Sequence, residues 1–120
     1  MSVPHLHRVP GRFVVEHLAH ATLPEDDEWV ALVRAPEGLT VVREAPPWVE
    51  AERWTGFYAD TPSGTGAPGV LAAILAPLAD AALPVFVAST YHADLVLVPE
   101  DDAERAAGTL RGAGVRVTVG

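Results

Sequence analysis

The chain has 120 residues and a mass of 12.7 kDa, enough for one domain or for two very small ones packed together. Eight basic residues, all of them Arg, oppose 16 Asp and Glu residues and leave a net charge of −8, which disfavours nucleic-acid or membrane partners. The absence of cysteine excludes disulfides, a thiol nucleophile and thiolate metal sites. We expect a cytoplasmic protein, because the N-terminus lacks the apolar core of a signal peptide and no apolar run approaches the ~18 residues that span a bilayer.

The first half of the chain is predicted to contain strands and no long helix. An acidic run at residues 23–28 predicts a turn or a single helical turn, and Ala-Pro-Glu-Gly at residues 35–38 is typical of a hairpin connection. Two prolines at positions 46 and 47 end the last strand, because proline cannot donate to a sheet ladder. The predicted strands span residues 12–18, 29–34 and 39–44.

The second half alternates strands and helices. Val70, Ile74 and Leu78 recur at four-residue spacing, which predicts one amphipathic helix, and acidic residues at the start of a second helix suit the positive end of its dipole. The order predicts an α+β fold, a ferredoxin-like βαββαβ unit with both helices on one face of the sheet. Its predicted elements are strands at 54–60, 84–90, 94–98 and 115–119, and helices at 69–82 and from 99 to 112 or 114.

Four segments of this half carry a resemblance to a known family. The most specific is Ser-Thr-Tyr-x-x-Asp followed by an apolar strand, at residues 89–98; the others are at residues 68–70, 76–80 and 84–86. On these segments the chain resembles the ACT-domain family, and more narrowly its small-protein branch related to the animal cytosolic arginine sensors, which contain tandem ACT-like halves. The resemblance implies an ACT domain at residues 54–120 and a helix-poor, degenerate ACT-like half at residues 1–53.

The resemblance also implies a function. ACT domains bind small effectors, usually amino acids, at interfaces between neighbouring domains, and they commonly pair their sheets side by side. We therefore expect a non-catalytic regulatory protein, a homodimer without cofactor or metal, that binds a free amino acid or a similar small zwitterion. The ligand-facing positions that the resemblance implies are Gly69, Val70, Pro84, Val85, Thr90 and Asp94.

Physical chemistry supports some of these positions and argues against one. The amides of a helix N-terminus such as Gly69 and Val70 can hold a carboxylate, and Asp94 can pair with an ammonium group. Pro84 has no N–H, so a carboxylate contact that needs this amide is absent. In a ferredoxin-like unit the Thr90–Asp94 turn and the strand start at Pro84 lie at opposite ends of the sheet. We therefore expect a neighbouring unit to complete the site.

Two motifs suggest enzymes, and both have a simpler interpretation. Residues 64–69 spell G-x-G-x-x-G between a strand and a helix, but too few residues follow for a dinucleotide-binding sheet, so a flexible loop is favoured. Ser89, His92 and Asp94 lie within six residues but lack a nucleophile elbow and an oxyanion hole. The simpler interpretation makes Ser89 and Thr90 hydroxyls that bond the turn backbone. For Asp94 a ligand role and a turn role both stay open.

Histidine and tryptophan give two further alternatives. The four histidines among the first twenty residues are not in a longer metal signature, so zinc is disfavoured. The tryptophans are predicted to anchor the core, with an aromatic wall for a ligand as the alternative at Trp54. The histidines are His5, His7, His17 and His20, and the tryptophans are Trp29, Trp48 and Trp54.

Two other functional classes remain open beside the regulatory module. One is a structural protein that associates with itself through a sheet edge, such as residues 115–119, and has a vestigial ligand site. The other is a small enzyme whose site is assembled across a dimer.

Overall fold

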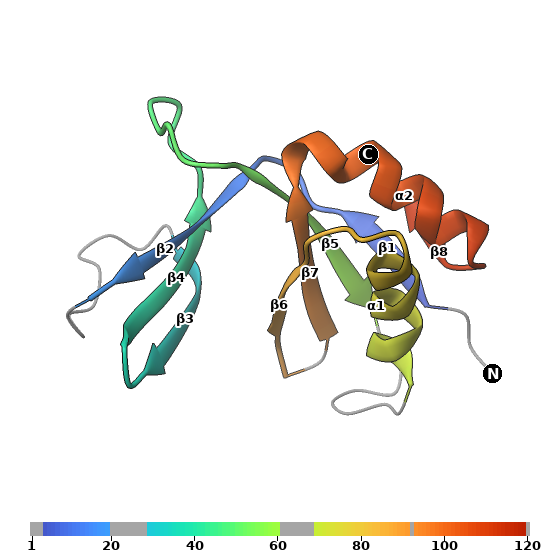
Figure 1. Ribbon diagram of the computed structural model, residues 1–120, viewed down its shortest axis with the longest axis horizontal. Helices are drawn as coiled ribbons and strands as arrows, with labels where there is room; N and C mark the ends of the chain where they lie inside the picture. The colour runs from blue at the N-terminus through green and yellow to red at the C-terminus, as the bar shows by residue number, and fades with distance from the viewer. Residues whose placement is uncertain (1–3, 20–28, 61–68, 92, 120) are drawn as a thin grey trace.

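In a computed structural model that describes residues 4–19, 29–60, 69–91 and 93–119, eight strands form one sheet with two helices (Figure 1). The strands are β1 His5–Arg8, β2 Phe13–Leu18, β3 Trp29–Ala35, β4 Gly38–Glu44, β5 Trp54–Asp60, β6 Phe86–Ser89, β7 Ala93–Pro99 and β8 Arg116–Thr118. The helices are α1 Val70–Asp80 and α2 Ala103–Gly112, and a 3-10 turn, η1 Glu100–Asp102, precedes α2.

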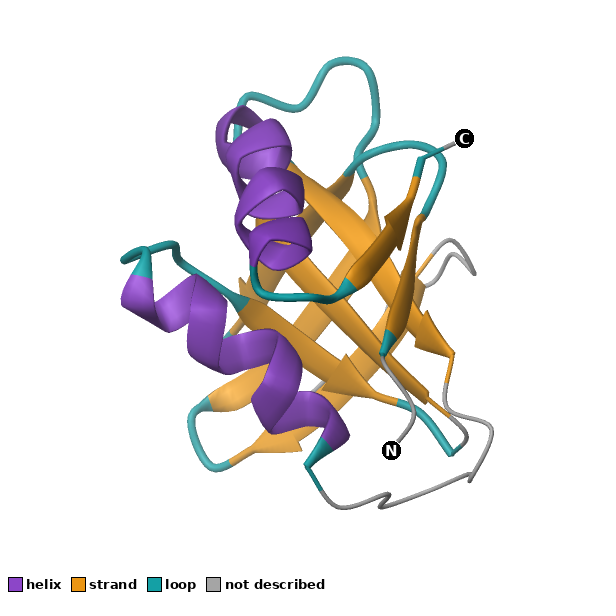
Figure 2. Cartoon of the chain, turned by 90° about the vertical axis from the view of Figure 1, so that its right-hand side faces the viewer, coloured by secondary structure: helices purple, strands orange, loops and turns teal. Residues whose placement is uncertain are grey.

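The second half has the predicted α+β arrangement. Its elements follow the order β5-α1-β6-β7-η1-α2-β8, which is the ferredoxin-like plan. Figure 2 shows both helices against the same face of the sheet, as expected for this fold. The long helices end close to the predicted positions because apolar periodicity defines them: α1 ends at Asp80, one turn after Pro77 removes a backbone donor, and α2 ends at Gly112.

Strand β1 was not predicted, and it changes the sheet. It lies between β5, to which it is antiparallel, and β8, to which it is parallel. The local order is therefore β6-β7-β5-β1-β8, so a strand of the N-terminal segment separates the first and last strands of the ferredoxin-like unit. A division of the chain at residue 53 stays a prediction, but the sheet of residues 54–120 includes β1.

The remaining strands continue the sheet away from the helices. Residues 9–12 link β1 to β2, which pairs with β4, and β4 pairs with β3 across a turn at Pro36 and Glu37. Figure 1 shows these three strands diverging from β6 and β7. The predicted hairpin at residues 35–38 is confirmed, whereas the predicted acidic turn at residues 23–28 lies outside the described residues.

Two apolar clusters cover the two faces of the sheet. The main core fills the space between the helices and the sheet, and a second cluster lies on the opposite face, where β2 and β4 approach β5 and β7. Burial of these side chains supplies most of the favourable free energy of folding. The main core includes Leu6, Phe57, Ile74, Leu78, Val96, Val98 and Leu110, and the second cluster is centred on Phe13, Val42 and Leu97.

The tryptophan prediction is wrong for one residue. Trp48 is 80% exposed, because it lies in a turn closed by the hydrogen bond from the Val49 amide to the Pro46 carbonyl, outside both clusters. Trp54 is partly buried and packs against the second cluster, as predicted for a core anchor. The side chain of Trp29 lies outside the described part of the structure.

Candidate functional site

The start of α1 is open and depends on glycine. Gly69 has φ +82°, a left-handed conformation that favours glycine. A Cβ atom built there meets no heavy atom of the described residues within 4 Å, so the position beside Gly69 is open. The Gly69 carbonyl accepts the first helical hydrogen bond, from the Ala73 amide at 3.0 Å, and Val70 packs against the main core. The first amides of a helix have no intrahelical acceptor, and such amides can bind an anion.

The β6–β7 turn is fixed by its own side chains. The Thr90 hydroxyl accepts a hydrogen bond from the Ala93 amide at 2.9 Å and donates to the Ala93 carbonyl at 3.1 Å. The Ser89 hydroxyl donates to Oδ1 of Asp94 at 2.7 Å across the register pair that ends the hairpin. Thr90 therefore has the turn role that the sequence suggested, and one carboxylate oxygen of Asp94 is already engaged.

Pro84 and Val85 precede β6 at the other end of the hairpin. Pro84 is exposed, and Val85 is half-buried against the main core. The Leu83 amide donates to the Leu78 carbonyl at 3.0 Å, so the chain turns directly from the end of α1 into this segment.

The three segments do not meet within one chain. Figure 1 shows the start of α1 and the β6–β7 turn at one end of the sheet, and the segment before β6 at the opposite end. The register agrees, since Asp60, the last residue of β5, pairs with Ala93, whereas Trp54, the first residue of β5, pairs with Pro99. Gly69, Val70, Thr90 and Asp94 therefore share one end, and Pro84 and Val85 lie at the other.

The alternative motifs gain little from the structure. The Ser89 hydroxyl bonds Asp94 directly, while His92 and residues 61–68, with most of the glycine-rich motif, lie outside the described residues. The ring centroids of His5 and His7 are 4.1 Å apart, but no group of three potential metal ligands occurs among the described residues. His20 is not described. In the same ranges, neither helix has the length and apolar character needed to cross a membrane.

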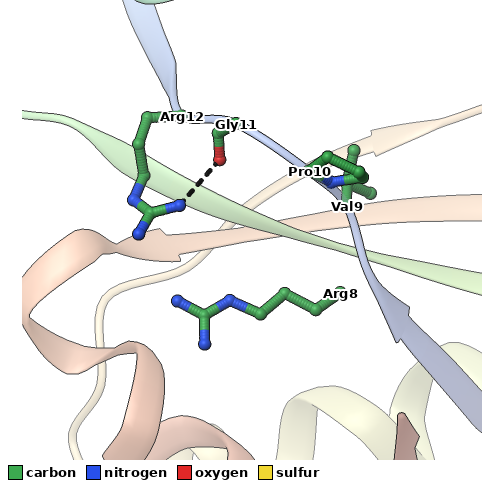
Figure 3. A pocket seen from close by; sticks show the side chains of 5 residues that line it. All are labelled: Arg8, Val9, Pro10, Gly11 and Arg12. Atoms are coloured by element: carbon green, nitrogen blue, oxygen red, sulfur yellow. Dashed lines mark hydrogen bonds between the residues drawn. The ribbon is translucent and has the colours of Figure 1, made fainter. Parts of the chain in front are cut away.

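A surface hollow that the sequence analysis did not anticipate lies at the β1–β2 link. It has a volume of about 260 Å³ and is lined by five consecutive residues, Arg8 to Arg12 (Figure 3). The link crosses β5 near its start, where the Val9 amide donates to the Gly56 carbonyl at 2.8 Å. Gly11 bends the link with φ +85°. Both arginine side chains extend to the same side of the link.

The two arginines connect this link to the start of α2. Nη1 of Arg8 lies 2.8 Å from Oε1 of Glu104, and Nε of Arg12 lies 3.0 Å from Oε1 of Glu100. Nη1 of Arg12 also donates to the Gly11 carbonyl at 3.0 Å. One feature of the sequence could have indicated these ion pairs. The two arginines flank Val-Pro-Gly and are four residues apart, and the two glutamates are also four residues apart, or about one helical turn.

Comparisons with known proteins agree with the fold. A solved structure of protein Atu0741 from Agrobacterium tumefaciens superposes with a TM-score of 0.85 at 23% identity, covering 100% of this chain and 96% of that one. VC0802 from Vibrio cholerae, described as a protein of unknown function and possible transport protein, gives 0.72 at 24% identity, covering 88% and 85%. No curated protein sequence matches the chain. The family model of the ACT domain matches residues 49–112, more than half of the sequence. The chain therefore belongs to the ACT-domain family.

Proposed function

We propose that this ACT-domain protein is a non-catalytic regulatory module that binds a free amino acid or a similar small zwitterion. ACT domains are ligand-binding regulatory units, and this membership supports the small-molecule role. The observation that carries the proposal is the joint position, at one end of the sheet, of the open α1 start and the Asp94 carboxylate. Helix-start amides can bind a carboxylate and the Asp94 carboxylate can bind an ammonium group, so groups that match both charges of an amino acid lie at the same end of the sheet.

The proposed site is completed by a second copy of the chain. Pro84 and Val85 are at the far end of β6, so a neighbouring molecule has to supply them if all three segments contact one ligand. Within the described residues, β6 pairs only with β7 and β8 pairs only with β1, and such edges are suited to pairing between chains. A homodimer is therefore part of the proposal, and sedimentation across micromolar concentrations measures its mass directly.

We propose no catalytic role. A Ser-His-Asp mechanism requires a serine hydroxyl bonded to a histidine that acts as its base. The Ser89 hydroxyl instead donates to Asp94 at 2.7 Å, which stabilises the hairpin end and activates no nucleophile.

A structural module with a vestigial site is the second candidate, and one observation favours it. Thr90 and Ala93 hydrogen-bond to each other, and the Ser89 hydroxyl donates to one carboxylate oxygen of Asp94. Part of the proposed site is therefore already hydrogen-bonded within the chain. A thermal-shift screen with the twenty amino acids separates the two candidates. A ligand at 100 times its dissociation constant stabilises the folded state by about 2.7 kcal/mol, or about 10 °C for a domain of this size. No shift with any amino acid at millimolar concentration favours the structural module.

A further inference from the structure

We propose that the hollow at the β1–β2 link is a second ligand site, which binds a small monocarboxylate through the Arg8 and Arg12 guanidinium groups. The hollow is distinct from the proposed amino-acid site. It lies near the start of β5, where the Val9 amide bonds the Gly56 carbonyl, whereas Asp94 lies beside the end of that strand. Gly56 and Ala59, the register partner of Asp94, are three residues of extended strand apart, or about 10 Å.

The donor inventory of Arg8 carries the proposal. A guanidinium has five N–H donors in a planar fork. Arg8 uses one of them, Nη1, in its hydrogen bond to Glu104, although its side chain is only 18% exposed. Its Nε and Nη2 donors are the pair that binds a carboxylate bidentately. Nε and Nη2 of Arg8 have no hydrogen-bond partner among the described residues and are accessible from solvent in the wall of the hollow, where a carboxylate can reach them.

Arg12 supplies a second, weaker contact. Its Nε and Nη1 donors are engaged by Glu100 and by the Gly11 carbonyl, which fixes the guanidinium in place. The remaining Nη2 group extends the donor set of the hollow. At Val9 and Pro10 the backbone offers no donor, because the Val9 amide is bonded to Gly56 and Pro10 has no N–H. The two guanidinium groups supply the positive charge that a carboxylate needs.

The existing ion pair of Arg8 does not block the site. The Glu104 side chain is 84% exposed, and exposed ion pairs contribute little because water and salt screen them. Glu104 competes with the ligand only as an exposed surface carboxylate. Removing the negative charge of Glu104 should therefore strengthen ligand binding. If the ion pair only stabilises the fold, no such gain is expected.

Size and charge define the ligand class. A volume of about 260 Å³ is below the range of drug-sized pockets and suits a molecule of a few heavy atoms. The side chains of Val9 and Pro10 line the hollow and can contact a short apolar body. The net charge of −8 opposes multiply charged anions, so a monocarboxylate is favoured over phosphate.

Propionate is the probe for this site, and amide NMR of the full chain is the readout. We expect saturable shifts at Val9, Gly11 and Arg12 in the millimolar range, at constant ionic strength set with chloride, and none with propionamide, which has the same shape without the charge. Arg8→Gln should weaken propionate binding about tenfold or more, because it removes a charge-assisted bidentate contact. Glu104→Gln should strengthen it severalfold. The control is Arg34→Gln, which removes the same charge from an exposed position on β3. This variant should leave the propionate affinity unchanged.

Several results would overturn the proposal. These are an absence of saturable propionate shifts above chloride, equal effects of Arg8→Gln and Arg34→Gln, or tighter binding of phosphate than of propionate. If Arg8→Gln does not fold, Glu104→Gln decides alone: propionate affinity equal to that of the parent chain contradicts the proposal. Binding at the proposed amino-acid site changes the shifts of other amides, around Gly69 and Asp94. The NMR titration therefore distinguishes a lack of binding at one site from a lack of binding at the other.

Discussion

Leu6, near the first described residue, is the parallel register partner of Val117, near the last one. On its other side Leu6 pairs with Ala59 of β5, and its side chain is fully buried in the main core. The start of the chain is thus built into the ACT sheet between two strands that adjoin each other in the simple ferredoxin-like plan. This arrangement makes the N-terminal segment part of the folding unit of the second half.

Leu6→Ala should therefore destabilise the whole domain. Removing a fully buried leucine from a packed core costs about 2–5 kcal/mol, through lost transfer free energy and the cavity left behind. Urea unfolding measures the change. Val33→Ala is the control, because Val33 lies on β3 and is 53% exposed, so its cost should stay below about 1 kcal/mol. Equal costs for the two variants would mean that β1 is not integral to the core.

Two glycine-to-alanine changes should have opposite effects on the free energy of unfolding. Gly69→Ala should destabilise by about 1–2 kcal/mol, because its φ of +82° is unfavourable for alanine although space is available. Gly108→Ala, at an exposed position inside α2 with equal space, should stabilise by about 0.5–1 kcal/mol, because alanine is the better helix former. Thermal unfolding of both variants checks the pair. A neutral Gly69→Ala would show that the start of α1 relaxes easily.

Two threonine-to-valine changes should also differ. Thr55 is fully buried on β5, and its hydroxyl has no hydrogen-bond partner among the described residues, so Thr55→Val should be neutral or stabilising. Thr90→Val removes two hydrogen bonds with Ala93 and should cost about 1–2 kcal/mol. Denaturant unfolding compares them. A cost above about 1 kcal/mol for Thr55→Val would reveal a partner for its hydroxyl, such as a buried water.

Local patterns predicted most of the fold. The helical periodicity of Val70, Ile74 and Leu78 and the apolar strand after Asp94 are local signals, and the structure has both elements. Strand β1 has no such signal, because His-Leu-His-Arg contains one apolar residue and its pairing partners, β5 and β8, are distant in sequence. Trp48 was wrongly predicted to be buried, because tryptophan is a large apolar residue. The preceding prolines instead place it in an exposed turn.

The candidate sites were predictable only in part. Thr90 was expected to bond the turn backbone, since hydroxyls at strand ends commonly do so, and it does. The hydrogen bond from Ser89 to Asp94 needs the strand register, which the sequence does not state. The hollow at Arg8 and Arg12 depends on the unpredicted strand β1 and on contacts with Glu100 and Glu104 almost a chain length away.

The central claim, amino-acid binding at the end of the sheet that contains Asp94, is tested most directly by amide NMR of the parent chain and of Asp94→Ala during titration with amino acids. The account predicts saturable shifts for at least one amino acid at Gly69, Val70 and Ala93. It also predicts that Asp94→Ala weakens that binding roughly 10- to 100-fold, because a hydrogen bond to a charged group contributes about 1.5–3 kcal/mol. The variant should keep the dispersed spectrum of a folded chain. Shifts with no amino acid, or equal affinity for parent and variant, would contradict the claim.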